Sequence, residues 1–275
     1  MESELFTKST ASRIAIVYIC TGDYHIFWDK FYRTSKKYLL GKHEKHYFIF
    51  TDYDQIKNGD DRTVIYRKSR GFPWDSLLRF EMFISIENDL KQFDYVYFFN
   101  SNMCFVGPVE EEIFPVNISS GLTGVIHPGY FNKHPFWFPY ERNPTSEAVI
   151  SHGYKKYRYF MGCLLGGQTM SFLEMCKICD ESIKKDLEKG IIAVYHDESH
   201  INHYFQDKEI MELDPGYGYP EGWNLPFTPR ILILNKVMHG GSAFDKLPNN
   251  TIFRRLRRKL MFSIESLSWY LNKNL

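Results

Sequence analysis

The first half of the chain alternates between short apolar runs and segments with a helical period. The runs typical of buried strands span residues 13–20, 45–51, 62–67 and 94–99. Apolar residues recur every three or four positions over 26–40 and 75–90, which predicts two helices, and Asp75 stands where it can cap the second. This alternation indicates an α/β fold, in which helices flank a sheet.

The second half has a less regular pattern. Residues 121–167 are rich in glycine, proline, histidine and aromatic residues, as is typical of loops that shape a binding site. Helices are predicted over 171–188 and 196–204, and a last strand over 230–234. Because no linker interrupts the chain, we expect one domain over residues 1–250.

The end of the chain, residues 251–275, has a different character. Four apolar residues share one helical stripe: Leu256, Leu260, Ile264 and Leu267. Five basic residues crowd its start: Arg254, Arg255, Arg257, Arg258 and Lys259. We expect a basic amphipathic helix here, which either lies peripherally on an anionic membrane surface or docks on the domain.

Composition narrows the classes of function. The formal net charge is +1, so nothing global indicates a nucleic-acid partner. We see neither a signal peptide nor an apolar run long enough to span a membrane, and we therefore expect a cytoplasmic protein, with any membrane contact at the inner face. The five cysteines are irregularly spaced, and Cys176 and Cys179 fall in a predicted helix, which favours free thiols over a redox or zinc motif.

Two strand ends carry polar residues that suit ligand binding. Thr21 and Gly22 follow the first strand, and Asn100 and Asn102 follow the strand over 94–99. In open α/β sheets ligands bind beyond the carboxyl ends of the strands. We therefore expect one site between these two strand ends.

The densest polar cluster, residues 195–200, allows two kinds of chemistry. His196 and His200 stand four residues apart and could bind zinc on a helix, although a zinc hydrolase of the common type needs glutamate directly after the first histidine. The alternative is a sugar site, in which one of Asp197 and Glu198 holds donor hydroxyls and the other faces the anomeric carbon.

Several blocks of the chain together resemble glycosyltransferase family 6, which contains the histo-blood-group A and B transferases and α-1,3-galactosyltransferases. The matching blocks, in order, are Ile49–Asp52, Leu78–Met82, Asp94–Met103, His127–Phe131, Tyr140–Arg142, Gly166–Gly167 and His196–His200. The resemblance covers about residues 13 to 238 and is closest to the bacterial, metal-independent type.

The resemblance implies a GT-A fold and a retaining transferase. Such enzymes move galactose or N-acetylgalactosamine from UDP to the 3-hydroxyl of a β-galactoside, often fucosylated, in an oligosaccharide or glycolipid. It also implies a donor half at about 13–110 and an acceptor and catalytic half at about 111–250.

The resemblance also assigns residues. Those matching the donor site are Ile19, Cys20, Thr21, Tyr24, Arg79, Asn100, Asn102, Met161, Gly162, Cys163, Asp197 and Lys236. Those matching the acceptor site are His127, Tyr195, His196 and Glu198, with Glu221 beside the position of an acceptor-binding aspartate. Glu198 matches the candidate nucleophile, which either forms a glycosyl-enzyme or stabilises an ion pair.

Asn100 and Asn102 occupy the positions of the family's metal-binding aspartates. Neutral amides are poor ligands for a hard cation, so we expect neither manganese nor magnesium as cofactor. Lys236 would then supply the positive charge that meets the leaving phosphate.

The donor-selecting segment favours the smaller sugar. Met161 and Cys163 are bulky there, so we expect UDP-galactose rather than UDP-N-acetylgalactosamine. A glycan-binding protein that has lost catalysis is the alternative, although such a relative would be expected to lose Glu198 or Lys236.

Overall fold

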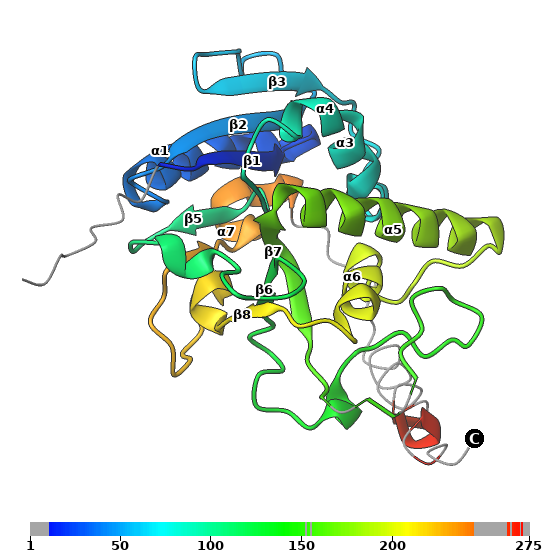
Figure 1. The fold of residues 1–275 in the computed structure, drawn as a ribbon. Coiled ribbons are helices and arrows are strands. Elements are labelled where there is room, and N and C mark those ends of the chain that lie inside the picture. The colour runs from blue at the N-terminus through cyan, green and yellow to red at the C-terminus, as the bar shows by residue number, and fades with distance from the viewer. Residues whose placement is uncertain are drawn as a thin grey trace, which may run out of the picture.

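A computed structural model describes residues 11–151, 153–154, 156–244, 263–264, 266–269 and 271 (Figure 1). Its main feature is a seven-stranded mixed sheet in the order β3-β2-β1-β4-β7-β6-β8. The strands are β1 (Arg13–Ile19), β2 (Glu44–Thr51), β3 (Arg62–Tyr66), β4 (Tyr95–Phe99), β6 (Leu122–Ile126), β7 (Phe160–Gln168) and β8 (Met211–Leu213). The first four strands run parallel, and β7 is antiparallel to both of its neighbours. The four strands predicted in the first half are confirmed.

The helices predicted outside residues 75–90 in the domain are present as α1 (Trp28–Tyr38), α5 (Thr169–Glu188) and α6 (Asp197–Phe205). A further helix, α7 (Lys236–Gly240), forms where the pattern predicted none. Short 3-10 turns are η1 (Gly22–Phe27), η2 (Glu111–Ile113), η3 (Pro135–Trp137), η4 (Pro215–Gly218) and η5 (Gly241–Ala243). The helices expected over 171–188 and 196–204 are thus present as α5 and α6.

The single helix predicted over 75–90 is wrong. The segment forms α2 (Trp74–Leu77), α3 (Arg79–Ser85) and α4 (Glu87–Leu90), because Leu78 and Ile86 leave helical backbone geometry. Asp75 does not cap a helix either, since α2 has Pro73 at that position. The Asp75 carboxylate instead accepts hydrogen bonds from the preceding loop, which the helical pattern does not encode.

Each face of the sheet carries its own apolar core. On one face Phe98 of β4 packs with Phe83 of α3 and Phe172 of α5. On the other face Phe99 packs with Phe31 of α1 and Phe105. Successive residues of a strand point to opposite faces, which is why β4 is apolar throughout.

A second, three-stranded sheet joins residues 219–233 to the end of β4. It comprises β5 (Met103–Phe105), β9 (Tyr219–Pro220) and β10 (Ile231–Ile233), in the order β5-β10-β9. Ile233 pairs with Met103 in the antiparallel register. The predicted last strand is therefore confirmed as β10, and its pairing carries the segment up to Lys236 toward Asn102.

Strand β7 contains a bulge opposite the junction of Gly124 and Val125 in β6. Gly124 pairs with Leu165, whereas the next residue of β6, Val125, pairs with Met161. Residues 162–164 therefore have no partner in β6. Bulges of this kind re-aim backbone groups and are frequent beside active sites.

The described part of the C-terminal segment is helical and docked. Trp269 Nε1 donates to the carbonyl of Ile150 at 2.6 Å, and Arg142 donates to Ser266 Oγ at 2.7 Å. Ile264 and Leu267, half of the predicted stripe, are exposed. Leu256, Leu260 and the five basic residues lie outside the described residues.

Two further sequence predictions meet the structure. Within the described ranges, no helix combines the length and the apolar composition that crossing a membrane requires. All five cysteines are free and buried, and Cys176 and Cys179 lie in α5, as expected for thiols packed in a helix.

Candidate functional site

The carboxylate of Glu198, in the first turn of α6, is held by two donors. The Tyr159 hydroxyl donates to Oε1 at 2.7 Å, and the Gly162 amide donates to Oε2 at 2.8 Å. Burial raises the pKa of Glu198, while the Gly162 and Tyr159 hydrogen bonds and the positive charge of Arg79 oppose that rise. The side chain is thereby fixed in one orientation.

The bulge of β7 supplies one of these donors. Gly162 lies in the unpaired stretch, so that its N–H reaches Glu198 and its carbonyl accepts from Arg79 Nη1 at 2.8 Å. A Cβ on Gly162 would lie 2.7 Å from Arg79 Nη2. Only glycine allows the backbone to approach this closely.

Arg79, the first residue of α3, forms a buried ion pair with Asp197. Burial lowers the pKa of Arg79 to about 10, and the charge of Glu198 opposes that shift. The guanidinium therefore stays charged at neutral pH and also lies 4.8 Å over the ring of Phe98. The two consecutive acids of α6 thus face different surroundings: Asp197 meets a cation, and Glu198 meets a hydroxyl and an amide.

Aromatic residues line the other side of Glu198. The ring of His127 lies 5.6 Å from that of Tyr159 and 4.8 Å from that of Tyr130. Burial lowers the pKa of His127 to about 4, so the imidazole is neutral at neutral pH, and its Nδ1 accepts from the Gly129 amide. Burial raises the pKa of Tyr130 to about 12, and the nearby Tyr195, which is exposed, adds to that rise.

His196 has an unusual backbone. Its φ is 53°, a region that non-glycine residues rarely adopt, and it directly precedes Asp197. Its ring packs edge-on against that of Phe72 at 4.9 Å. Strained backbone geometry is frequent at functional sites.

At the ends of β1 and β4, the three-stranded sheet positions Lys236. The Asn102 amide donates to the carbonyl of Leu234 at 2.8 Å, and the Leu234 amide donates back to the Asn102 carbonyl. Lys236 Nζ then donates to the hydroxyl of Tyr24 at 2.9 Å. The backbone amide of Asn100 donates to the carbonyl of Cys163, and this bond joins the end of β4 to the bulge of β7.

The first strand end is fixed through its side chains. Thr21 Oγ1 donates to Asp75 at 3.1 Å. Cys20 is fully buried, and burial raises the pKa of its thiol to about 12, so it serves packing rather than chemistry. Ile19, the last residue of β1, is half-buried and packs against the apolar core on one face of the sheet.

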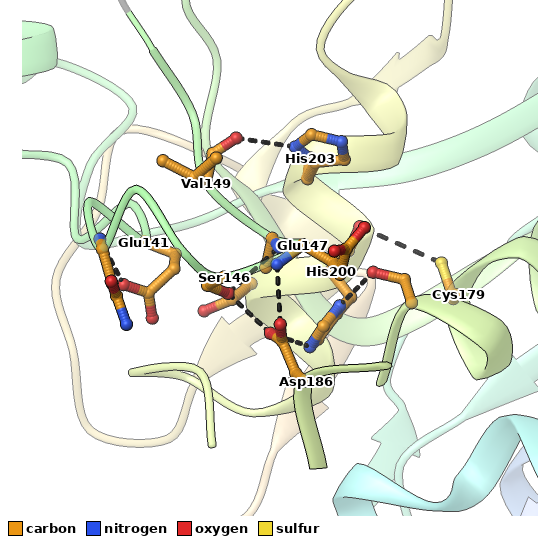
Figure 2. Close-up of polar contacts among 12 residues, drawn as sticks. Glu141, Ser146, Glu147, Val149, Cys179, Asp186, His200 and His203 are labelled. Atoms are coloured by element: carbon orange, nitrogen blue, oxygen red, sulfur yellow. Dashed lines mark hydrogen bonds and ion pairs between the residues drawn. The ribbon is translucent and has the colours of Figure 1, made fainter. Parts of the chain in front are cut away.

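Two expected site residues have contacts of another kind. Glu221 accepts from the Asn235 amide at 2.7 Å and bonds His239, which places it against the start of α7. His200 is buried, bonds Ser182 at 2.7 Å and lies 3.7 Å from Asp186 (Figure 2).

The zinc hypothesis finds no support in this geometry. His196 contacts Phe72, whereas His200 belongs to the network around Asp186. No group of three or more histidine, cysteine, aspartate or glutamate side chains in the described chain could hold a metal ion.

The side chains of Asn100 and Asn102 bear on whether a metal ion could bind at the end of β4. Asn100 and Asn102 offer neutral oxygens only, and the amide nitrogen of Asn102 is engaged with Leu234. A hard divalent cation favours carboxylate ligands. The residues at this position therefore do not fit a manganese or magnesium site.

Tyr159 and Asp75 contact the site in ways that sequence reasoning missed. Tyr159 precedes the apolar run of β7, where its hydroxyl is indistinguishable from that of any core tyrosine. Its spacing from Met161 and Cys163, which puts all three on one side of an extended chain, was the available signal.

Comparison with known proteins adds an independent observation. The model of the family "Glycosyltransferase family 6" matches residues 3–239. An Escherichia coli protein, "O-antigen biosynthesis glycosyltransferase WbnI", is 35% identical over 225 residues, which cover 81% of this chain and 94% of that protein. "Histo-blood group ABO system transferase 2" of Rattus norvegicus is 29% identical over 76% of this chain, and "Globoside alpha-1,3-N-acetylgalactosaminyltransferase 1" of Gallus gallus is 28% identical over 80%. The chain spans 65% of the length of each of these two animal relatives.

Proposed function

Since this chain belongs to glycosyltransferase family 6, we propose that it is a retaining α-1,3-glycosyltransferase that moves galactose from UDP-galactose to a β-galactoside. The observation that carries the proposal is the fixed carboxylate of Glu198 beside the buried pair of Arg79 and Asp197. A carboxylate held in this way suits a positive charge that develops at an anomeric carbon.

We propose that Glu198 acts mainly as a stabiliser of the oxocarbenium ion. Both of its oxygens already accept a hydrogen bond, from Tyr159 and from Gly162, which lowers their nucleophilicity. The bond from the anomeric carbon to the β-phosphate oxygen breaks, and its electrons stay on the phosphate. The acceptor 3-hydroxyl forms the new bond on the same face, and its proton passes to the departing phosphate.

The leaving diphosphate needs positive charge. We propose that Lys236 supplies it, that the side-chain amide of Asn100 adds a neutral hydrogen-bond donor, and that no divalent metal takes part. Lys236 is held at the first strand end by Tyr24, and β10 fixes the approach of its backbone. A charge-assisted hydrogen bond to phosphate is among the stronger polar contacts in proteins.

The choice of galactose as donor rests on packing. Cys163 is buried, and its Sγ lies 3.1 Å from where a Cβ of Gly218 would stand, with Met161 Sδ 3.7 Å from the same point. Two bulky side chains thus fill the segment that matches the family's donor-selecting residues. This favours the smaller sugar over N-acetylgalactosamine.

We also propose that the C-terminal helix lies peripherally on an anionic membrane surface, at the inner face of the membrane. Its docked face carries Ser266 and Trp269, while Ile264, Leu267 and Leu271 are 53%, 52% and 66% exposed. In a helix these two sets lie on opposite sides. An exposed apolar stripe after a basic stretch suits a lipid surface.

One assay tests the transferase proposal. UDP-galactose and UDP-N-acetylgalactosamine are offered with lactose or 2′-fucosyllactose, with and without EDTA. We expect transfer from UDP-galactose that EDTA does not reduce, and a loss of about 10²- to 10³-fold in Glu198→Gln. Glu209→Gln, an exposed glutamate bonded to Ser119, is the matched control.

The outcomes separate the alternatives. Strong activation by manganese would overturn the metal-independent account, and preference for UDP-N-acetylgalactosamine would overturn the donor assignment. Glycan binding without turnover in the wild-type protein would favour the glycan-binding alternative.

A further inference from the structure

Phe72 is an exposed ring on a loop with a fixed backbone. It is 79% exposed, although burial of a phenylalanine side chain stabilises the folded state. A single exposed apolar residue is ordinary on a protein surface. What distinguishes Phe72 is what holds its loop and what its ring faces.

Two carboxylates hold the loop, and the first, Asp52, accepts from the Ser69 amide at 2.9 Å. Asp75 accepts hydrogen bonds from Ser69 Oγ at 2.7 Å, the Arg70 amide at 2.8 Å and the Gly71 amide at 3.1 Å. It also accepts from Thr21 Oγ1, at the end of β1. The backbone that presents Phe72 is therefore tied to the nucleotide side of the site.

The ring faces the residue that opens the catalytic helix. Phe72 and His196 lie 4.9 Å apart with their planes at 85°. His196 has a φ of 53° and immediately precedes Asp197 and Glu198, so the contact joins the first half of the chain to the second at the carboxylates. Burial lowers the pKa of His196, which keeps it neutral.

We infer that Phe72 binds the acceptor sugar by stacking on the apolar face of a pyranose ring, an assignment that rests on the proposed transferase function. The donor sugar would lie against Asp197, which is buried, whereas an oligosaccharide acceptor extends into solvent and meets exposed rings. Phe72 and Tyr195 are such rings: Phe72 packs against His196, and Tyr195 directly precedes His196 in the chain. Rigid aromatic faces provide contact area at little cost in side-chain entropy.

The test separates acceptor binding from donor chemistry. Phe72→Ala, Phe72→Trp and wild type are compared in two assays: hydrolysis of UDP-galactose without acceptor, and transfer to lactose and 2′-fucosyllactose. We expect Phe72→Ala to raise the acceptor KM about five- to tenfold and to leave hydrolysis within about twofold of wild type, because the Asp75 network stays intact. Phe72→Trp should restore most of the acceptor affinity.

Tyr66→Ala, which removes an equally exposed ring from strand β3, is the control and should change neither assay. An unchanged acceptor KM in Phe72→Ala, or a parallel loss of hydrolysis and transfer, would overturn the assignment. Wild-type protein that hydrolyses UDP-galactose but neither binds nor transfers to these two acceptors would overturn it as well. Absence of any sugar-nucleotide turnover in the wild-type protein would instead contradict the proposed function itself.

Discussion

Residues 13–110 and residues 111–244 contribute to one site through different kinds of structure. The first region presents the ends of parallel strands, at Thr21 and Asn100, as open α/β sheets generally do. The second region presents an irregularity in β7 and the first turn of α6. Position in the first region follows from regular pairing, whereas position in the second depends on particular side chains and one glycine.

The difference teaches where tolerance to substitution should lie. In the first region, Asn100 directly follows β4, and its backbone amide donates to the carbonyl of Cys163 in β7. In the second region, Glu198 owes its orientation to Tyr159 and Gly162, which are 39 and 36 residues away in sequence. Conservative changes should therefore cost more in the second region.

Lys236 offers the strongest test, because it belongs to the second region by sequence and to the first by position. We expect Lys236→Ala to lower kcat about a hundredfold or more, since it removes the charge proposed to meet the leaving phosphate. Lys236→Arg should retain more activity because it keeps the charge. Steady-state kinetics with UDP-galactose measure the effect.

Lys184→Ala is the matched control, since Lys184 pairs with Asp180 on the surface of α5. If Lys236→Ala stays within about threefold of wild type, positive charge at this strand end is not what drives departure of the diphosphate.

The regular region was also the more predictable one from sequence. Apolar runs such as residues 13–20 and 94–99 predict buried strands. Because ligands bind beyond the carboxyl ends of strands in open α/β sheets, Thr21 and Asn100 are predicted at the site from their positions alone. The prediction failed at 75–90, where periodicity continues across Leu78 and Ile86 although the backbone leaves the helix at both. Apolar periodicity reports which face is buried, and it does so equally for one helix or three short ones.

The geometry of the second region could not be read from local pattern. Nothing near Glu198 in sequence shows that Tyr159 and Gly162 hold it, because those contacts arise from a bulge that only strand pairing creates. The family resemblance named Glu198 and Gly162 but gave no role to Tyr159. Bulges and buried hydroxyl contacts are tertiary features, so a sequence pattern indicates the residues without their arrangement.

Tyr159→Phe sharpens the comparison through pH. Burial raises the pKa of Glu198, and the Tyr159 hydroxyl opposes that rise by bonding the ionised form. Loss of the hydroxyl should raise the pKa further, so the acid limb of the kcat/KM profile should move to higher pH. Activity is expected to fall severalfold at neutral pH, with the larger loss below it.

Tyr140→Phe is the control for that experiment. Tyr140 is buried near Tyr159, but its hydroxyl donates to the backbone of Arg158. It should lower stability without moving the acid limb. A shift of equal size in both variants would mean that general loosening of the aromatic cluster, rather than the bond to Glu198, sets the pH dependence.

The smallest effect on catalysis is expected at the C-terminal helix, whose described contacts with the second region come from Ser266 and Trp269. Changing Ile264, Leu267 and Leu271 together to serine removes the exposed stripe and leaves Ser266 and Trp269 in place. Transfer to a soluble acceptor should stay within about twofold of wild type, because surface substitutions rarely disturb a folded domain.

Binding of the triple variant to vesicles that contain anionic lipid, measured by flotation, should weaken strongly. The three apolar side chains that would be buried in the lipid surface are replaced by polar ones. Wild-type binding should also weaken with added salt, as expected when Arg254, Arg255, Arg257, Arg258 and Lys259 contribute. Unaltered vesicle binding in the triple variant would exclude this face as the contact, and a large loss of catalysis would show that the helix shapes the acceptor region rather than a membrane surface.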